Sequence, residues 1–244
     1  ISSVTFDSGD YVNNAEDESA IDLVIVTSGA EDGETVTATL NGADYTCDLS
    51  SNTCTASITS VGLKALTDGT AYTFSVAVSD TAGNAATADT SESFTYDITA
   101  PTSTTAVESV TGTGDANDAD VVTITLDPSE TVGTPTCTFT DGSGAMEDTS
   151  VEYATTGDDS HTAKVTVHND DDDGAVGFSC TYADLAGNDI ASAITVATSG
   201  AVTIDNTHPT MTPVSIDETG DGNANDGDDI TLSFTASEGI QTPT

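Results

Sequence analysis

The chain has 244 residues, of which 42 are acidic, and they face only two lysines, Lys64 and Lys164, and no arginine, so the formal net charge is −40. Nucleic acid phosphates and anionic membranes need Lys or Arg to neutralise them, so we exclude nucleic acid as a partner and expect no direct membrane insertion. The sequence shows no apolar run near the roughly 20 residues of a membrane span and no signal peptide. Because residues 1–7 already have the pattern of a strand, we expect a segment of something longer.

Alternating apolar residues predict seven short strands in the first hundred residues. The clearest is 20–27, where Ile21, Leu23 and Ile25 alternate on one face. Residues 60–66 allow at most one helical turn. The predicted strands are 2–7, 20–27, 34–40, 43–49, 54–59, 70–80 and 91–97.

The same alternation continues between residues 120 and 205, again without helical periodicity. Gly, Asn, Asp and Pro separate the strands, which is typical of an antiparallel sandwich. The apolar residues that mark these strands, in chain order, are Val122, Ile124 and Leu126; Cys137 and Phe139; Val151 and Tyr153; Val165 and Val167; Val176, Phe178, Cys180 and Tyr182; and Val196, Val202 and Ile204.

Two motifs recur along the chain and define its organisation. Asp-x-Ala-Gly-Asn occupies 80–84 and 184–188, and Asp-x-Thr-x-Pro-Thr occupies 97–102 and 205–210; Pro101 and Pro209 lie 108 residues apart. A repeat of about one hundred residues has the size of one β-sandwich. We therefore predict an all-β fold of tandem Ig-like antiparallel sandwiches of about seven strands each. The predicted domains are 1–100, 101–208, and the first strands of an incomplete third copy at 209–244.

Four cysteines fall two in each predicted domain. Neither Cys-x-x-Cys nor zinc-like histidine spacing occurs, so an even count favours disulfides Cys47–Cys54 and Cys137–Cys180 and an oxidising, extracellular setting. By chain entropy the first bond would contribute about 2.5 kcal/mol and the second about 4 kcal/mol. The alternative is four buried free thiols.

The segment 66–84 followed by 97–102, and the fragments 181–188, 202–210 and 223–240, resemble the Ig-like repeats of bacterial and archaeal surface proteins and large adhesins. The resemblance covers essentially the whole chain and is specific for the repeat class, without naming a parent protein. The first predicted domain departs from the family between its second and third strands, and the cysteines are unusual for the family. By strand order, Cys137 and Cys180 lie on neighbouring strands of one sheet, unlike the cross-sheet pair of antibody domains.

Sandwiches laid end to end bring particular acidic loops together. The loop after the first strand and the end of the last strand meet the second-to-third and sixth-to-seventh strand loops of the next domain. We expect this to gather oxygen ligands for Ca²⁺, which takes six to eight at about 2.3–2.6 Å. The resemblance also implies calcium in such linkers. The first junction would collect Asn14, Glu16, Asp17, Glu18, Asp97, Glu130, Asp184 and Asn188, and the second Asp115, Asn117, Asp118, Asp120, Asp205 and Glu238.

Other interpretations of the acidic loops remain open. They would also suit solvated turns whose Asn and Asp side chains cap the backbone. Residues 220–229 superficially match an EF-hand loop, but no helix flanks them and no Glu stands at the twelfth position; residues 168–174 are best explained as a solvated turn. Asp127, Glu130 and Asp184 could supply a carboxylate pair for glycoside hydrolysis, but the chain has no Trp and implies no aromatic-lined cleft. No Ser-His-Asp arrangement or phosphate-binding Gly loop appears, so we expect no enzyme activity.

These features predict an extracellular structural segment of a cell-surface protein: an adhesin stalk, a surface-layer subunit or a filament subunit. Its partners would be other domains or copies of the same protein. The alternatives are an Ig-like module that binds a glycan or a host protein, and an accessory domain of a secreted enzyme. In the third copy, Ile230, Leu232 and Phe234 would form an exposed apolar face, so we expect further sequence or another chain to cover it.

Overall fold

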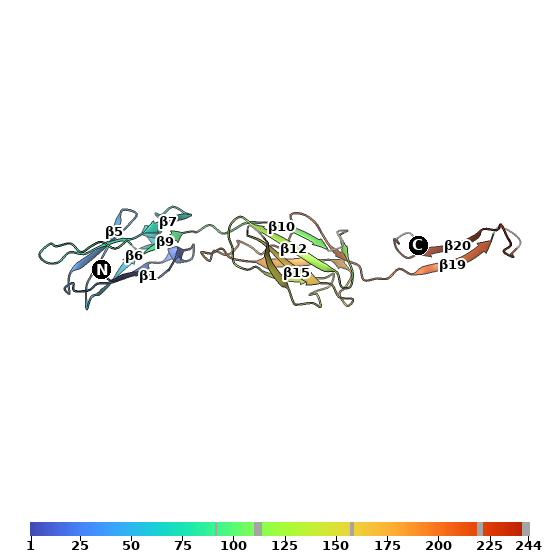
Figure 1. Ribbon diagram of the computed structural model, residues 1–244, viewed down its shortest axis with the longest axis horizontal. Helices are drawn as coiled ribbons and strands as arrows, with labels where there is room; N and C mark the ends of the chain where they lie inside the picture. Colours follow the sequence, from blue (N-terminus) through green and yellow to red (C-terminus); the bar gives the residue numbers. More distant parts are fainter. Residues whose placement is uncertain (91, 110–113, 157–158, 219–221, 241–244) are drawn as a thin grey trace.

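A computed structural model of the chain describes residues 1–90, 92–109, 114–156, 159–218 and 222–240. Two β-bodies and a two-stranded ribbon follow one another along the long axis (Figure 1). The described helices are η1 (Glu16–Glu18) and α1 (Ser60–Leu63), the single turn allowed by the sequence. The predicted all-β class is confirmed. In the described part of the chain no helix has the length and apolar character to cross a membrane.

The first body consists of three small sheets. Their strands, in spatial order, are β1 (Ser3–Phe6), β3 (Ile21–Val26) and β6 (Thr53–Ile58); β5 (Ala43–Asp48), β4 (Thr35–Leu40) and β8 (Ser75–Ala77); and β2 (Tyr11–Val12), β9 (Ser93–Tyr96) and β7 (Thr70–Thr73). The short β2 runs parallel to the last strand, β9, and every other pairing in this body is antiparallel.

The second body repeats this plan with a larger sheet. Its strands, in spatial order, are β10 (Ser103–Ser109), β12 (Val121–Pro128), β15 (Ser160–Thr166) and β14 (Glu152–Thr156); β11 (Asp115–Ala116), β18 (Thr203–Ile204) and β16 (Gly174–Ala175); and β13 (Thr136–Thr140) and β17 (Gly177–Thr181). Here β11 runs parallel to the last strand, β18, as β2 does to β9.

Each body has its own hydrophobic core. In the first, Leu23 and Ile25 are fully buried on β3, and the rings of Phe6, Phe74 and Phe94 pack with centroids 4.8–5.6 Å apart. In the second, the buried side chains of β12 and β15 pack against those of β13 and β17. The two cores form separate clusters, although the domain boundaries at 100 and 208 stay a prediction.

Three strands differ from the sequence expectation. The predicted strand 70–80 is divided, because β7 pairs with β9 whereas β8 pairs with β4 in another sheet. Val196 does not join the last strand of the second body; it lies in a bend and is 77% exposed. Every residue of the edge strand β14 is exposed, including Tyr153. The Tyr153 hydroxyl donates to Cys137 O.

Both predicted disulfides are present, and no cysteine is free. Cys47 and Cys54 close a loop of sequence separation 7 between β5 and β6. Cys137 and Cys180 lie directly opposite each other on β13 and β17, with a separation of 43. The expectation that this second pair joins neighbouring strands of one sheet is confirmed.

The ribbon contains β19 (Met211–Glu218) and β20 (Ile230–Ala236), paired antiparallel. Its register places Val214 opposite Phe234 and Ile216 opposite Leu232, so these side chains share one face. In the second body Ile124 and Leu126, which match Leu232 and Phe234 at an offset of 108 residues, are fully buried, whereas Leu232 is 59% exposed and Phe234 is half-buried. Of the apolar face predicted for the third copy, Ile230 and Leu232 are exposed and Phe234 is half-buried.

Candidate metal centre at the domain junction

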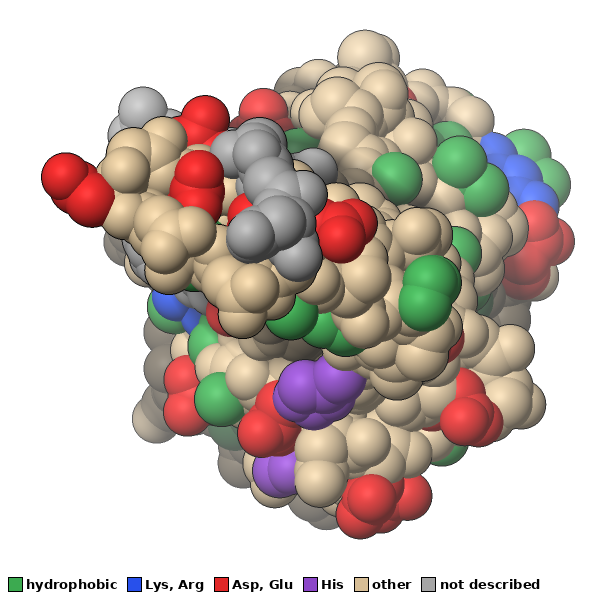
Figure 2. All heavy atoms as spheres, turned by 90° about the vertical axis from the view of Figure 1, so that its right-hand side faces the viewer, with side chains coloured by type: hydrophobic (Ala, Val, Ile, Leu, Met, Phe, Trp, Pro, Cys, Tyr) green, Lys and Arg blue, Asp and Glu red, His purple; other side chains and the backbone are tan. Residues whose placement is uncertain are grey.

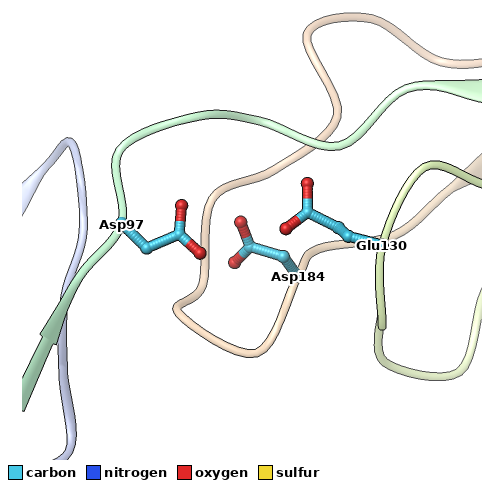
Figure 3. Close-up of side chains that lie close together, drawn as sticks. All are labelled: Asp97, Glu130 and Asp184. Carbon is cyan, nitrogen blue, oxygen red and sulfur yellow. The ribbon is translucent and has the colours of Figure 1, made fainter. Parts of the chain in front are cut away.

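Three carboxylates converge where the two bodies meet. Asp97 directly follows β9 at the start of the linker, Glu130 lies in the loop after β12, and Asp184 opens the 184–188 loop after β17. Their side chains point toward one another (Figure 3). One carboxylate oxygen of each lies within 4.8 Å of the others, and Asp184 is buried while the other two are half-buried. Among the described residues no other group of three acidic, histidine or cysteine side chains is gathered in this way.

Hydrogen bonds between the bodies fix the linker against the second body. Asn188 donates from Nδ2 to Asp97 O at 2.8 Å, and its Oδ1 accepts from Asn14 N at 3.0 Å. Asn13 donates from Nδ2 to Ala186 O at 2.9 Å. The loop after β2 and the linker thus both dock on the 184–188 loop, and Asn188 serves as the bridge between them.

The 184–188 loop is itself shaped by Asp184. Its Oδ1 accepts from Asn188 N and its Oδ2 from Asn188 Nδ2, both at 2.9 Å. Gly187 has a φ of +92°, and a Cβ there would lie 3.2 Å from Asn13 Nδ2. Glycine therefore permits both the left-handed turn and the close approach of the first body.

The carboxylates of the junction repel one another. Burial raises the pKa of the Asp97 carboxyl, and the charges of Asp184 and Asp68 raise it further, although a hydrogen bond from Thr99 N opposes them. Burial likewise raises the pKa of Glu130, with added contributions from Asp97 and Asp184. Charges at this separation repel by roughly 1 to 4 kcal/mol per pair between water-like and surface-like dielectric. The site therefore favours a proton or a cation.

Protein cations do not supply that counter-charge. The single ion pair among the described residues joins Lys64 Nζ to Glu18 Oε1 at 2.8 Å, and Lys164 lies on β15 opposite Glu152. Figure 2 views the molecule from the ribbon end, where Asp and Glu side chains are spread over the surface and basic side chains are sparse.

The structure gives Glu16, Asp17 and Glu18 other partners. Glu16 Oε2 accepts from Asn13 N at 3.1 Å, which makes it a cap of the loop that contains it. Asp17 is 2% exposed and accepts the Tyr96 hydroxyl at 2.6 Å. Burial, followed by this hydrogen bond, raises the pKa of Tyr96 above its usual range. These residues stabilise the end of the first body and do not join the three converging carboxylates.

The second junction repeats part of the arrangement. Asn117, Asp118 and Asp205 line a cleft of about 440 Å³, and Asp120 Oδ2 caps Asn117 N at 3.0 Å, as Glu16 caps Asn13. The remaining predicted residues, Asp115 and Glu238, stand at the start of β11 and after β20.

Glu238 occupies the place in the third copy that Glu130 has in the second. Ser237 exchanges two hydrogen bonds with Thr210, as Ser129 does with Thr102.

Two linker-binding aspartates were missed by the sequence reasoning. Asp68 accepts from Ile98 N at 2.8 Å and from the Thr99 hydroxyl. Asp173, in the segment interpreted as a solvated turn, accepts from Asn206 N at 2.6 Å and from the Thr207 hydroxyl. The signal that could have revealed them is an Asp-Gly pair shortly before the sixth strand of each body, at 68–69 and 173–174.

No protein-family model and no curated protein sequence matches the chain. Among solved structures, it is similar to a segment of a 1.5-MDa bacterial ice-binding adhesin (TM-score 0.47, 23% identity, 82% of this chain and 63% of that one). It is also similar to a Ca²⁺-stabilised, ice-binding adhesin of an Antarctic bacterium (0.46, 23%, 86% and 51%). A third similar structure is a tetra-tandem repeat from the extending region of a large adhesion protein (0.34, 16%, 95% and 62%). The chain spans about half to two thirds of each of these three structures.

Proposed function

We propose that the chain is a non-enzymatic, load-bearing segment of a cell-surface protein, in which Ca²⁺ bound at the junction of the two sandwiches stiffens an extended rod. The observation that carries this proposal is the convergence of Asp97, Glu130 and Asp184 from a linker and two loops of the next body. An ion held there would tie the linker to the second sandwich.

The chemistry of the three side chains suits calcium better than other common metals. All three offer carboxylate oxygens, and among the residues that the structure describes no histidine or cysteine is gathered with them. Zinc prefers nitrogen and sulfur ligands, and magnesium demands a near-ideal octahedron and keeps several waters, whereas calcium accepts flexible oxygen sets. Asp97, Glu130 and Asp184 would hold the ion, and the ion would supply the positive charge that the site lacks.

The surroundings of the junction support a mechanical role. The two disulfides and the cell-surface proposal agree, since such bonds persist in oxidising environments. The two bodies stand in a row (Figure 1), so stiffness at their junction would set the reach of the rod.

Calorimetric titration of the EDTA-treated full chain with CaCl₂ tests the proposal. We expect a saturable heat, and Asp184→Asn should weaken that binding by about tenfold or more because one of three charges is lost. The matched control is Asp189→Asn, the same change at the exposed position that directly follows the 184–188 loop. No heat from the wild-type chain, or equal weakening by both variants, would contradict a site at this junction.

A further inference from the structure

We infer that Asp68 and Asp173 are positioning residues that clamp the linker after each sandwich, so that the direction of each junction is set by the protein before any cation binds. Both aspartates are exposed; Asp68 lies shortly before β7 and Asp173 directly before β16. Each holds the two residues that follow a junction aspartate, Asp97 or Asp205.

The two clamps are built alike. One carboxylate oxygen of Asp68 accepts a linker N–H from Ile98, and the other accepts the hydroxyl of Thr99. In the same way, one carboxylate oxygen of Asp173 accepts from Asn206 N and the other accepts the Thr207 hydroxyl. The same two-point grip therefore occurs twice, 105 residues apart at the aspartate and 108 apart at the linker. Two independent copies indicate a recurring device instead of an incidental surface contact.

The clamp has a consequence for the carboxylate of Asp97. Asp68 and Asn188 hold the N–H of Ile98 and the carbonyl of Asp97, which belong to one peptide unit, so the backbone on the C-terminal side of Asp97 cannot rotate freely. On its N-terminal side, Asp97 N donates to Val12 O at 2.9 Å. The side chain is thereby kept near Asp184 and Glu130 in spite of their repulsion. The apparent affinity of a site falls when only a fraction of the molecules has the geometry that can bind. A site whose geometry is fixed before binding therefore loses less affinity in this way.

Charge-assisted hydrogen bonds also make the clamp resistant to acid. The Thr99 hydroxyl, followed by Ile98 N, lowers the pKa of Asp68, and the Thr207 hydroxyl, followed by Asn206 N, lowers that of Asp173. A carboxyl whose pKa is lowered stays ionised, and keeps its hydrogen bonds, until the pH falls through the lowered pKa. The clamp thus persists in mildly acid solution.

Residual dipolar couplings of the full chain in EDTA test the clamp apart from calcium. We expect wild-type couplings from both sandwiches to fit one alignment tensor, and Asp68→Ala to reduce the order of one body relative to the other by about twofold. The matched control is Asp32→Ala, which removes an exposed aspartate that holds Ser51 N at 2.7 Å, away from the linker. Two sandwiches that already tumble independently in wild type, or an Asp68→Ala chain indistinguishable from Asp32→Ala, would overturn the inference.

A crossed relaxation experiment checks that each clamp acts locally. Asp173→Ala should increase fast backbone motion in residues 206–210 and leave 98–102 unchanged, while Asp68→Ala should do the reverse. Equal effects on both linkers would show general destabilisation and contradict the assignment.

Only the link from Asp68 to cation affinity rests on the proposed function. If calcium binds, Asp68→Ala should raise its dissociation constant by about three- to tenfold. Loosened couplings in EDTA together with no calcium heat in wild type would leave the clamp standing and reject the calcium junction. Calcium binding together with couplings that Asp68→Ala leaves unchanged would reject the clamp and leave the calcium junction standing.

Discussion

Asn188 and Asp97 lie 91 residues apart in sequence and belong to different sandwiches, yet Asn188 Nδ2 donates to Asp97 O at 2.8 Å. The same asparagine donates to Asp184 Oδ2 and accepts from Asn14 N, so one side chain connects two of the hydrogen bonds between the bodies with the carboxylate site. Its counterpart in the first body, Asn84, makes the same internal bonds to Asp80.

Asn188→Ala should therefore weaken docking more than Asn84→Ala. Both variants remove an internal cap, and only the first also removes two bonds between the bodies. We expect an additional loss of about 1–2 kcal/mol in the free energy of unfolding, measured by chemical denaturation. Equal losses would show that Asn188 acts solely within its own loop.

The raised pKa values of Asp97 and Glu130 predict an unusual pH dependence without calcium. A folded-state carboxyl with a raised pKa binds its proton more tightly than in the unfolded chain, whose aspartate and glutamate values lie near 4. In EDTA, stability should thus rise as pH falls from neutral toward about 4. An Asp97→Asn/Glu130→Gln chain should show a smaller rise in melting temperature, because only the repulsion common to the whole acidic chain remains.

Saturating calcium should reverse this trend, since a bound cation favours the ionised carboxylates. Melting temperatures recorded at pH 7 and pH 5 with and without calcium provide the comparison. A wild-type profile identical to that of the double variant in EDTA would contradict a strained cluster at the junction.

The two disulfides should contribute unequally. Their sequence separations are 43 and 7, so chain entropy gives about 4 kcal/mol for Cys137–Cys180 and about 2.5 kcal/mol for Cys47–Cys54. Paired Cys→Ala variants, compared by guanidinium denaturation, should rank in that order. A larger loss at the short loop would contradict the chain-entropy account.

The ribbon should be the least protected part of the chain. Ile216 and Leu232 are exposed on a two-stranded ribbon, whereas the matching face of the second body is buried, and isolated two-stranded ribbons are marginally stable. In a monomer, amide hydrogens of β20 should exchange much faster than those of β17. Protection that appears with assembly would support covering by another chain, and equal protection in the monomer would contradict the expectation.

The repeat reasoning located the junction carboxylates because the order of strands decides which loops face each other. That order places Asp97, Glu130 and Asp184 at the first junction together with five other residues, and metal binding by them stays a prediction. The strand order does not predict the burial of Asp17, because that burial depends on a hydrogen bond from the Tyr96 hydroxyl. In the second body the position that matches Tyr96 is Ile204, which has no hydroxyl. The three adjacent acidic residues 16–18 look equivalent in sequence, yet each has a different partner. Glu16 accepts from Asn13 N, Asp17 accepts the Tyr96 hydroxyl, and Glu18 pairs with Lys64.

Asp68 and Asp173 escaped prediction for a related reason. An aspartate in a turn usually bonds its own loop, and the sequence does not show that a linker about 30 residues later runs past it. Val196 was misplaced because apolar alternation cannot distinguish a strand from an extended segment that bends away from the sheet.

Crystals of the chain grown with calcium, with anomalous diffraction collected at long wavelength, would test the central claim most directly. The account predicts an anomalous peak at the first junction with oxygens of Asp97, Glu130 and Asp184 about 2.3–2.6 Å away. In Asp184→Asn crystals that peak should weaken or vanish. Ordered density for all three carboxylates with no peak between them would contradict the account.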